Sequence, residues 1–280
     1  MTNPIADPLV EVVDSDADSS LVRIEATQDG VATVIMNRPA QRNAFNAELI
    51  GALHEAFETL HGAEGVRVVF LKGQGGFFSA GADLEWMREA AEWTEADNRD
   101  DAMAMARMLK SLWDIPALTV ALVEGGAFGG GCGLAAACDI AVATADAKFS
   151  FSEVKLGLIA ATISPYVVGA IGPRNARALF ATGRVFDAAH AEKVGLISEV
   201  AGDTTMLAEV RDRIVREIMQ TAPGAVADSK TLVEAVAFRE IDHGLMEETA
   251  RRIARARVGE EGQAGVRAFL EKKKAPWVAG

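Results

Sequence analysis

Three short runs of mostly apolar, β-branched residues restrict the fold of this chain more than any other feature. They cover residues 66–71, 118–123 and 140–144, and segments with helical spacing separate them. Runs of this length and composition are typical of strands that are buried on both faces. Their alternation with helices predicts a parallel sheet covered by helices, which is an α/β fold.

A hairpin and a capped helix precede these runs. Residues 22–27 and 31–36 alternate apolar and polar side chains on either side of Asp29-Gly30, which favours a β-hairpin. An apolar helical face then follows Asn46, a typical helix-capping residue, as far as Gly62. Both elements fit at the start of an α/β domain.

The last third of the chain is helical in pattern. Helical spacing recurs over four segments: 204–220, 223–237, 242–257 and 261–273. The first residues are acidic and contain no Lys or Arg, so we expect a disordered tail without a targeting signal. We therefore predict a tail over residues 1–20, an α/β core over 21–200 and a helical region over 201–280.

Charge and cysteine usage narrow the class of partners. A net charge of -12 argues against nucleic acid, because phosphate backbones are bound by clustered Lys and Arg. No uninterrupted apolar stretch of about 18 residues suggests a membrane span. Cys132 and Cys138 are spaced unlike a disulfide framework, and none of the four histidines has metal-ligand spacing. We expect a reduced, cytoplasmic protein without a bound metal.

Two glycine-bearing loops follow predicted strands and could carry chemistry. They cover residues 77–84 and 124–133, and a helix is expected directly after each. Helix N-termini present free N–H groups, so two such loops could direct two donors at one oxygen, as in an oxyanion hole. Two alternatives stay open from the residues alone. The glycines could serve only tight turns, or Gly131 to Ala136 could be a dinucleotide fingerprint with Glu153 as its ribose-binding acid.

Glu153 is the candidate acid or base. It lies in the alternating segment 149–157, beside Phe151 and Val154, where partial burial would raise its pKa toward the range useful for proton transfer. An ordinary solvated glutamate is the alternative interpretation. Asp83 is explained more simply as a helix N-cap than as a catalyst.

At these residues the chain resembles the enoyl-CoA hydratase/isomerase family, the crotonases. The resemblance runs in order along most of the chain. Its motifs are Asn37-Arg-Pro39 with Arg42-Asn-Ala44, Ser79-Ala-Gly-Ala-Asp83, Gly125 through Gly131, Cys138-Asp-Ile140, and Glu261-Gly262 through Lys273 with Pro276-Trp277. It implies a crotonase-like α/β fold, in which ββα turns form a spiral core and a helical C-terminal region forms a homotrimer or homohexamer.

The resemblance also implies a site. The backbone N–H groups of Ala82 and Gly130 would bind the thioester oxygen of an acyl-CoA, and Glu153 would handle protons. Residues along the substrate would be Arg42, Ala44, Ala80, Gly81, Asp83, Leu84, Phe128, Gly129, Gly133, Gly157 and Leu158. Phe269 and Lys272 would contact CoA, either in the same chain or across to the CoA of a neighbouring subunit. No cofactor is implied, because coenzyme A is part of the substrate.

One departure from the family pattern concerns the acids. Typical hydratases of the family have two glutamates, whereas here Gly133 stands at the first position and only Glu153 is present. The segment after Glu153 resembles that of bacterial methylglutaconyl-CoA-type hydratases of leucine or isoprenoid degradation. We expect a hydratase that adds water to a 2-enoyl-CoA, with a branched or carboxylated acyl chain filling room left at Gly133. A Δ3,Δ2-enoyl-CoA isomerase with one glutamate, a non-catalytic acyl-CoA-binding protein and other enolate chemistries are the alternatives.

Overall fold

The computed structural model describes residues 20–278, so the predicted acidic tail lies outside the described residues except for its last position. The chain divides into two compact units. The first contains the residues up to Ile115 together with Thr119–Arg211, and the second contains Pro116–Leu118 and the residues from Asp212 onward.

A six-stranded sheet forms the centre of the first unit. Its strands lie in the order β1–β2–β3–β4–β6–β9. Their bounds are β1 (Val22–Ala26), β2 (Val31–Met36), β3 (Val68–Gly73), β4 (Leu118–Val123), β6 (Ile140–Thr144) and β9 (Glu199–Ala201). β1 and β2 form the predicted antiparallel hairpin, whereas β2 pairs with β3, β4 with β6, and β6 with β9 in parallel. The predicted parallel sheet is confirmed, and its four inner strands, β2, β3, β4 and β6, are almost wholly buried.

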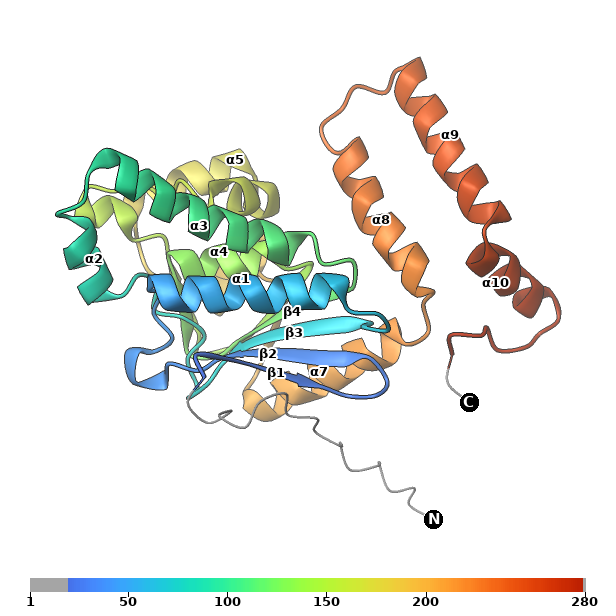
Figure 1. Ribbon diagram of the computed structural model, residues 1–280, viewed down its shortest axis with the longest axis horizontal. Helices are drawn as coiled ribbons and strands as arrows, with labels where there is room; N and C mark the ends of the chain where they lie inside the picture. Colours follow the sequence, from blue (N-terminus) through green and yellow to red (C-terminus); the bar gives the residue numbers. More distant parts are fainter. Residues whose placement is uncertain (1–19, 279–280) are drawn as a thin grey trace, which may run out of the picture. The chain divides into compact units, whose positions relative to one another are not determined.

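Helices and 3-10 turns lie between these strands, and α7 follows the last strand. They are η1 (Pro39–Gln41), α1 (Ala47–Gly62), α2 (Leu84–Ala90), α3 (Glu95–Trp113), α4 (Gly130–Ala137), η2 (Glu153–Leu156), α5 (Ser164–Thr182), α6 (Ala188–Val194) and α7 (Thr204–Ile218). The side chain of Asn46 caps α1 by accepting a hydrogen bond from the N–H of Leu49. α1 and α3 run side by side along one face of the sheet, and the core lies between them and the strands (Figure 1).

A smaller sheet places the glycine loops. It contains β5 (Gly126–Phe128), β7 (Lys148–Ser150) and β8 (Phe186–Asp187), with β5 and β7 parallel. The backbone N–H of Gly129 donates to the carbonyl of Ser150 at 2.9 Å. The end of the second glycine loop is thereby fixed beside the segment that leads into Glu153.

The second unit is built from α8 (Pro223–Val236), α9 (His243–Val258) and α10 (Glu260–Leu270) (Figure 1). The carboxylate of Glu261 accepts hydrogen bonds from the N–H groups of Gly224 and Ala225, which fixes the start of α8 to α10. α8 buries no side chain within the chain, and α9 and α10 bury only Leu245 and Ala268. Among residues 20–278, no helix is both long enough and apolar enough to cross a bilayer.

Candidate active site

The two glycine loops lie side by side as a short parallel pair. The N–H of Ser79 donates to the carbonyl of Gly126 at 3.1 Å, and the N–H of Phe128 donates to the carbonyl of Ser79 at 3.0 Å. Ser79 and Ala127 are therefore paired in parallel. This pairing brings together two segments that are far apart in the sequence. The sequence favoured this arrangement, because both loops follow strands of the predicted parallel sheet.

Ala82 and Gly130 each lie three residues beyond this pair, and each has a free backbone N–H. Phe45 binds both neighbours of Ala82: its N–H donates to the carbonyl of Gly81 at 2.7 Å, and its carbonyl accepts from the N–H of Asp83 at 2.8 Å. Within residues 20–278 the N–H of Ala82 has no acceptor. Gly130 is the first residue of α4, so its N–H has no partner inside the helix. Two fixed, unused donors therefore follow two paired loops.

Glu153 lies beside the second loop. A β-carbon built on Gly129 would be 3.1 Å from Oε1 of Glu153, so the carboxyl group occupies the space where a side chain of residue 129 would be. The Oε2 atom is buried and has no hydrogen-bond partner in the described part of the chain. Burial raises the pKa of Glu153, and a hydrogen bond from its own backbone N–H opposes this rise only in part. The alternative of an ordinary solvated glutamate does not fit this environment.

Gly133 does not face open space. The expectation that an acyl chain fills space left at this position is therefore wrong. A β-carbon on Gly133 would lie 2.3 Å from Cγ2 and 2.8 Å from Cβ of Ile163. Ile163 is 2% exposed and β-branched, so it cannot move aside by a simple rotation. The isoleucine fills the volume that a larger residue at position 133 would need.

The dinucleotide interpretation of residues 131–136 is also wrong. Gly131 and Gly133 lie inside α4 and not in a loop ahead of it. Their missing side chains face Ser79 and Ile163, so both glycines serve close packing within the protein. Neither backbone position is open to a pyrophosphate.

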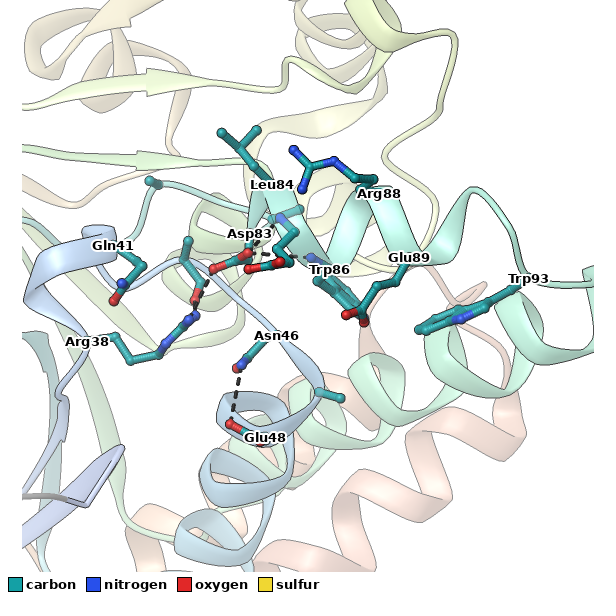
Figure 2. A pocket seen from close by; sticks show the side chains of 15 residues that line it. Arg38, Gln41, Asn46, Glu48, Asp83, Leu84, Trp86, Arg88, Glu89 and Trp93 are labelled. Atoms are coloured by element: carbon teal, nitrogen blue, oxygen red, sulfur yellow. Dashed lines mark hydrogen bonds and ion pairs between the residues drawn. The ribbon is translucent and has the colours of Figure 1, made fainter.

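An open cleft of about 850 Å³ lies beside the first loop (Figure 2). Among the predicted substrate residues, it is lined by Ala44, Ala80, Ala82, Asp83 and Leu84. Residues that sequence reasoning did not assign to a site also line it: Arg38, Gln41, Asn46, Ala47, Glu48, Glu85, Trp86, Arg88, Glu89 and Trp93. Figure 2 shows Arg38 reaching Asp83 from one wall, with Trp86 and Trp93 on the α2 side.

Arg38 is the most informative of the missed residues. Its guanidinium donates to Oδ2 of Asp83 at 3.1 Å and also to the carbonyl of Ala44. Asp83 in turn caps α2 by accepting from the N–H of Glu85 at 2.8 Å, as predicted. Arg38 lies in the Asn37-Arg-Pro39 motif, which resembles a CoA-contacting loop of the family, but nothing in the sequence assigned a role to Arg38 itself.

Other predicted substrate residues lie near this cleft without lining it. Arg42 has φ 49° and places its guanidinium 5.5 Å from the ring centre of Phe77. The Phe77 ring stacks on Phe128 with centroids 6.1 Å apart. A β-carbon on Gly81 would contact the backbone of Phe128. Arg42 and Phe128 are thus joined through one aromatic side chain.

The remaining predicted positions fall into two groups. Gly157 ends η2 with φ 74°, and the N–H of Leu158 donates to the carbonyl of Glu153 at 3.0 Å, so both follow the acid directly. Phe269 and Lys272 belong to the second unit, where Phe269 is 81% exposed. Their contact with CoA stays a prediction.

Comparison with known proteins is consistent with this geometry. The sequence pattern of the family described as enoyl-CoA hydratase/isomerase matches residues 26–279. A solved Legionella pneumophila structure that carries the name enoyl-CoA hydratase/isomerase (crotonase) is 45% identical, covers 92% of this chain and 99% of its own, and superposes with a TM-score of 0.86. An enoyl-CoA hydratase from Shewanella pealeana is 37% identical, with 92% and 96% covered and a TM-score of 0.89.

A relative from Thermus thermophilus that carries the name of an enoyl-CoA hydratase is 34% identical over 252 residues, which is 89% of this chain and 98% of the relative. The fold and the paired loops define a crotonase-type protein, as expected. The chain belongs to the enoyl-CoA hydratase/isomerase family. It is an enzyme of the hydratase family, which acts on acyl-CoA substrates.

Proposed function

We propose that this enzyme adds water across the 2,3 double bond of a 2-enoyl-CoA. The observation that carries the proposal is the pair of unused N–H donors on Ala82 and Gly130, with the partly buried acid Glu153 beside the second loop. The thioester oxygen accepts both hydrogen bonds, and these donors stabilise the negative charge that develops on this oxygen in the enolate. The CoA part of the substrate lies along the cleft lined by Ala44, Ala80, Asp83 and Leu84.

A single carboxyl group balances the reaction. The Glu153 carboxylate removes a proton from water as the water oxygen bonds to C3, and the electron pair of the double bond moves into the thioester enolate. The protonated Glu153 then returns the proton to C2, and the carbonyl re-forms. Burial supports this role, because the raised pKa makes the carboxylate a stronger base. No cofactor beyond the substrate's own coenzyme A takes part.

A Δ3,Δ2-enoyl-CoA isomerase is the second candidate. The apolar side chain of Ile163 occupies the space at Gly133, where a second acid stands in typical hydratases, and this favours a proton shuttle on one acid. In that reaction Glu153 would take a proton from C2 of a 3-enoyl-CoA and return it to C4. A non-catalytic acyl-CoA-binding role is less well supported, because burying an unpaired carboxyl oxygen is costly and binding alone does not require it.

The substrate class, assembly and compartment are further parts of the proposal. The resemblance of the segment after Glu153 to methylglutaconyl-CoA-type hydratases supports a branched or carboxylated acyl chain. The exposed apolar faces of the second unit support a homotrimer or homohexamer. Cys132 and Cys138 are both buried, and neither forms a disulfide in the described part of the chain, which supports the cytoplasm as the compartment.

The test is the loss of the 2-enoyl-thioester ultraviolet band. Purified enzyme is added to crotonyl-CoA and, separately, to 3-methylglutaconyl-CoA, with Glu153→Gln and the surface variant Glu58→Gln compared. Hydration predicts a fast loss that falls by at least about 100-fold in Glu153→Gln and is unchanged in Glu58→Gln. If neither compound loses its band but 3-enoyl-CoA gains one, the isomerase is correct and the hydratase is not.

A further inference from the structure

Gly133 and Ile163 fit together, because the isoleucine side chain fills the space that the glycine leaves. The distances of 2.3 and 2.8 Å from a β-carbon placed at position 133 to Ile163 are too short for any real contact. The contact involves the branched end and the Cβ of Ile163 and not the tip of a flexible chain, so it cannot relax at low cost. In this protein, residue 133 is small because Ile163 fills its place.

The pair and the acid both lie near the start of α4. The N–H of Gly133 donates to the carbonyl of Gly129 at 3.2 Å, so the two glycines are one helical turn apart. The missing side chain of Gly129 faces Glu153, and the missing side chain of Gly133 faces Ile163. Gly129 is the N-cap of α4 and Gly133 lies inside the helix, so the carboxyl group lies beside the start of α4 and the isoleucine lies one turn further on.

This order matches the direction in which an acyl-CoA would extend. Gly130 at the start of α4 offers its N–H to the thioester oxygen, Glu153 lies beside the first turn, and Ile163 lies beside the next. The acyl carbons beyond the reacting C2 and C3 therefore approach Ile163. The absence of any polar partner for Oε2 of Glu153 among the described residues is in keeping with an apolar neighbour on this side.

We propose that Ile163 determines acyl-chain specificity: it closes the acyl end of the site behind Glu153 and limits the length of a straight enoyl chain. The proposal rests on the proposed enoyl-CoA reaction and goes beyond it, because it names the side chain that selects among enoyl-CoAs. Hydrophobic pockets discriminate by about tenfold or more for each methylene that fits or clashes. Shortening Ile163 should therefore change the ranking of substrates more than the rate with any one of them.

The first experiment compares kcat/KM for 2-hexenoyl-CoA and crotonyl-CoA in three variants. Ile163→Ala should raise the hexenoyl-to-crotonyl ratio by about tenfold or more, with Ile163→Val in between. The control is Ile171→Ala, which removes an equally buried isoleucine from the same helix region without contacting Gly133. A ratio in Ile163→Ala that equals the ratio in Ile171→Ala and in the wild type would overturn the proposal.

The second experiment tests the pairing itself. Alanine is a better helix former than glycine, so Gly133→Ala would stabilise α4 if the space were free. We expect Gly133→Ala to lose folded yield and acyl-CoA affinity, and Gly133→Ala/Ile163→Ala to recover both. A Gly133→Ala variant as stable and as active as the wild type would also overturn the proposal.

Failure of the proposed reaction can be told apart from failure of this inference. If the wild type turns over no enoyl-CoA, the same variants are compared by calorimetric binding of butyryl-CoA and hexanoyl-CoA. A preference that moves toward hexanoyl-CoA only in Ile163→Ala supports the role of Ile163 without any reaction. A preference that is the same in all variants defeats it.

Discussion

Arg38 and Asp83 lie beside Ala82, which offers the first oxyanion donor in the proposed reaction. Their side chains are largely buried, at 14% and 15% exposed, so the ion pair is shielded from solvent. Burial alone would raise the pKa of Asp83, but hydrogen bonds from the N–H of Glu85 and from Arg38 together hold this pKa below its ordinary value. Asp83 is therefore a fixed anion next to Ala82, and Arg38 is a positioning residue that acts through it.

Replacing Arg38 should separate kcat from KM. Arg38→Met keeps the apolar stem but loses the hydrogen bonds to Asp83 and to the Ala44 carbonyl. We expect kcat to fall by about tenfold or more with a smaller change in KM, because a displaced Ala82 N–H weakens binding of the enolate more than of the substrate. Arg38→Lys should restore part of kcat. A rise in KM at constant kcat would instead show that Arg38 only binds the substrate.

The raised pKa of Glu153 gives a pH dependence with a definite sign. In the proposed reaction the carboxylate is the base, so kcat/KM should fall as the pH drops through this raised pKa. The folded-state pKa lies above the unfolded one, so protonation favours the folded state. The stability that Glu153 contributes is therefore complete below the unfolded pKa and is lost as the pH rises through the folded pKa.

Glu153→Gln separates these two effects. The variant removes the cost of the buried charge, so at neutral pH it should melt at a higher temperature than the wild type while being nearly inactive. The gap in melting temperature should close as the pH is lowered, when both proteins carry a neutral group at this position. A wild type and a variant that melt alike at every pH would contradict a desolvated Glu153.

At the scale of elements, Asn43 joins two loops around the site. Its side chain accepts from the N–H of Arg38 at 2.8 Å and donates to the carbonyls of Gln74 and Phe77 at 3.0 and 2.7 Å. The residue is 0% exposed and has φ 54°, a conformation that asparagine tolerates. The loop after β2 is thereby fixed to the loop that follows β3.

Asn43→Ala should destabilise the fold by about 3 kcal/mol, because it leaves buried backbone groups without partners. The measurement is equilibrium unfolding in urea. Asn46→Ala, the same change three residues later, removes the cap of α1 and an exposed hydrogen bond to Glu48, and it should cost about 1 kcal/mol. Equal losses in the two variants would mean that the Asn43 bonds do not determine the stability of this region.

Local signals in the sequence predicted the helices and strands better than they predicted the contacts between side chains. The α1 helix begins after Asn46 and ends at Gly62 as expected, since a cap and an apolar face are both written locally. β3 begins at Val68 instead of Val66, because the N–H groups of Arg67 and Val68 both turn toward the carbonyl of Gly30. The filling of Gly133 by Ile163 was beyond prediction, since the two residues meet only in the folded chain.

At the scale of the whole molecule, the two units differ in how far their apolar side chains are buried. The first unit buries most of its large apolar residues under the sheet and its helices. The second unit exposes apolar side chains along all three helices, including Val233 at 65%, Ile253 at 51% and Val266 at 55%. Helices with uncovered apolar faces are typical of surfaces that pair with another chain. The second unit is therefore the part of the chain where assembly would contribute most to stability.

This surface predicts the behaviour of the protein in solution. The wild type should scatter light with the mass of a trimer or hexamer, and Ile253→Glu should lower that mass because a charge on a buried interface is costly. Glu247→Gln on the same helix is the control and should leave the mass unchanged. The variant should also lose thermal stability only through dissociation, so its melting temperature should become less dependent on protein concentration than that of the wild type. A wild type that is monomeric at micromolar concentration would contradict the prediction, and the exposed apolar faces of α8, α9 and α10 would then need another partner.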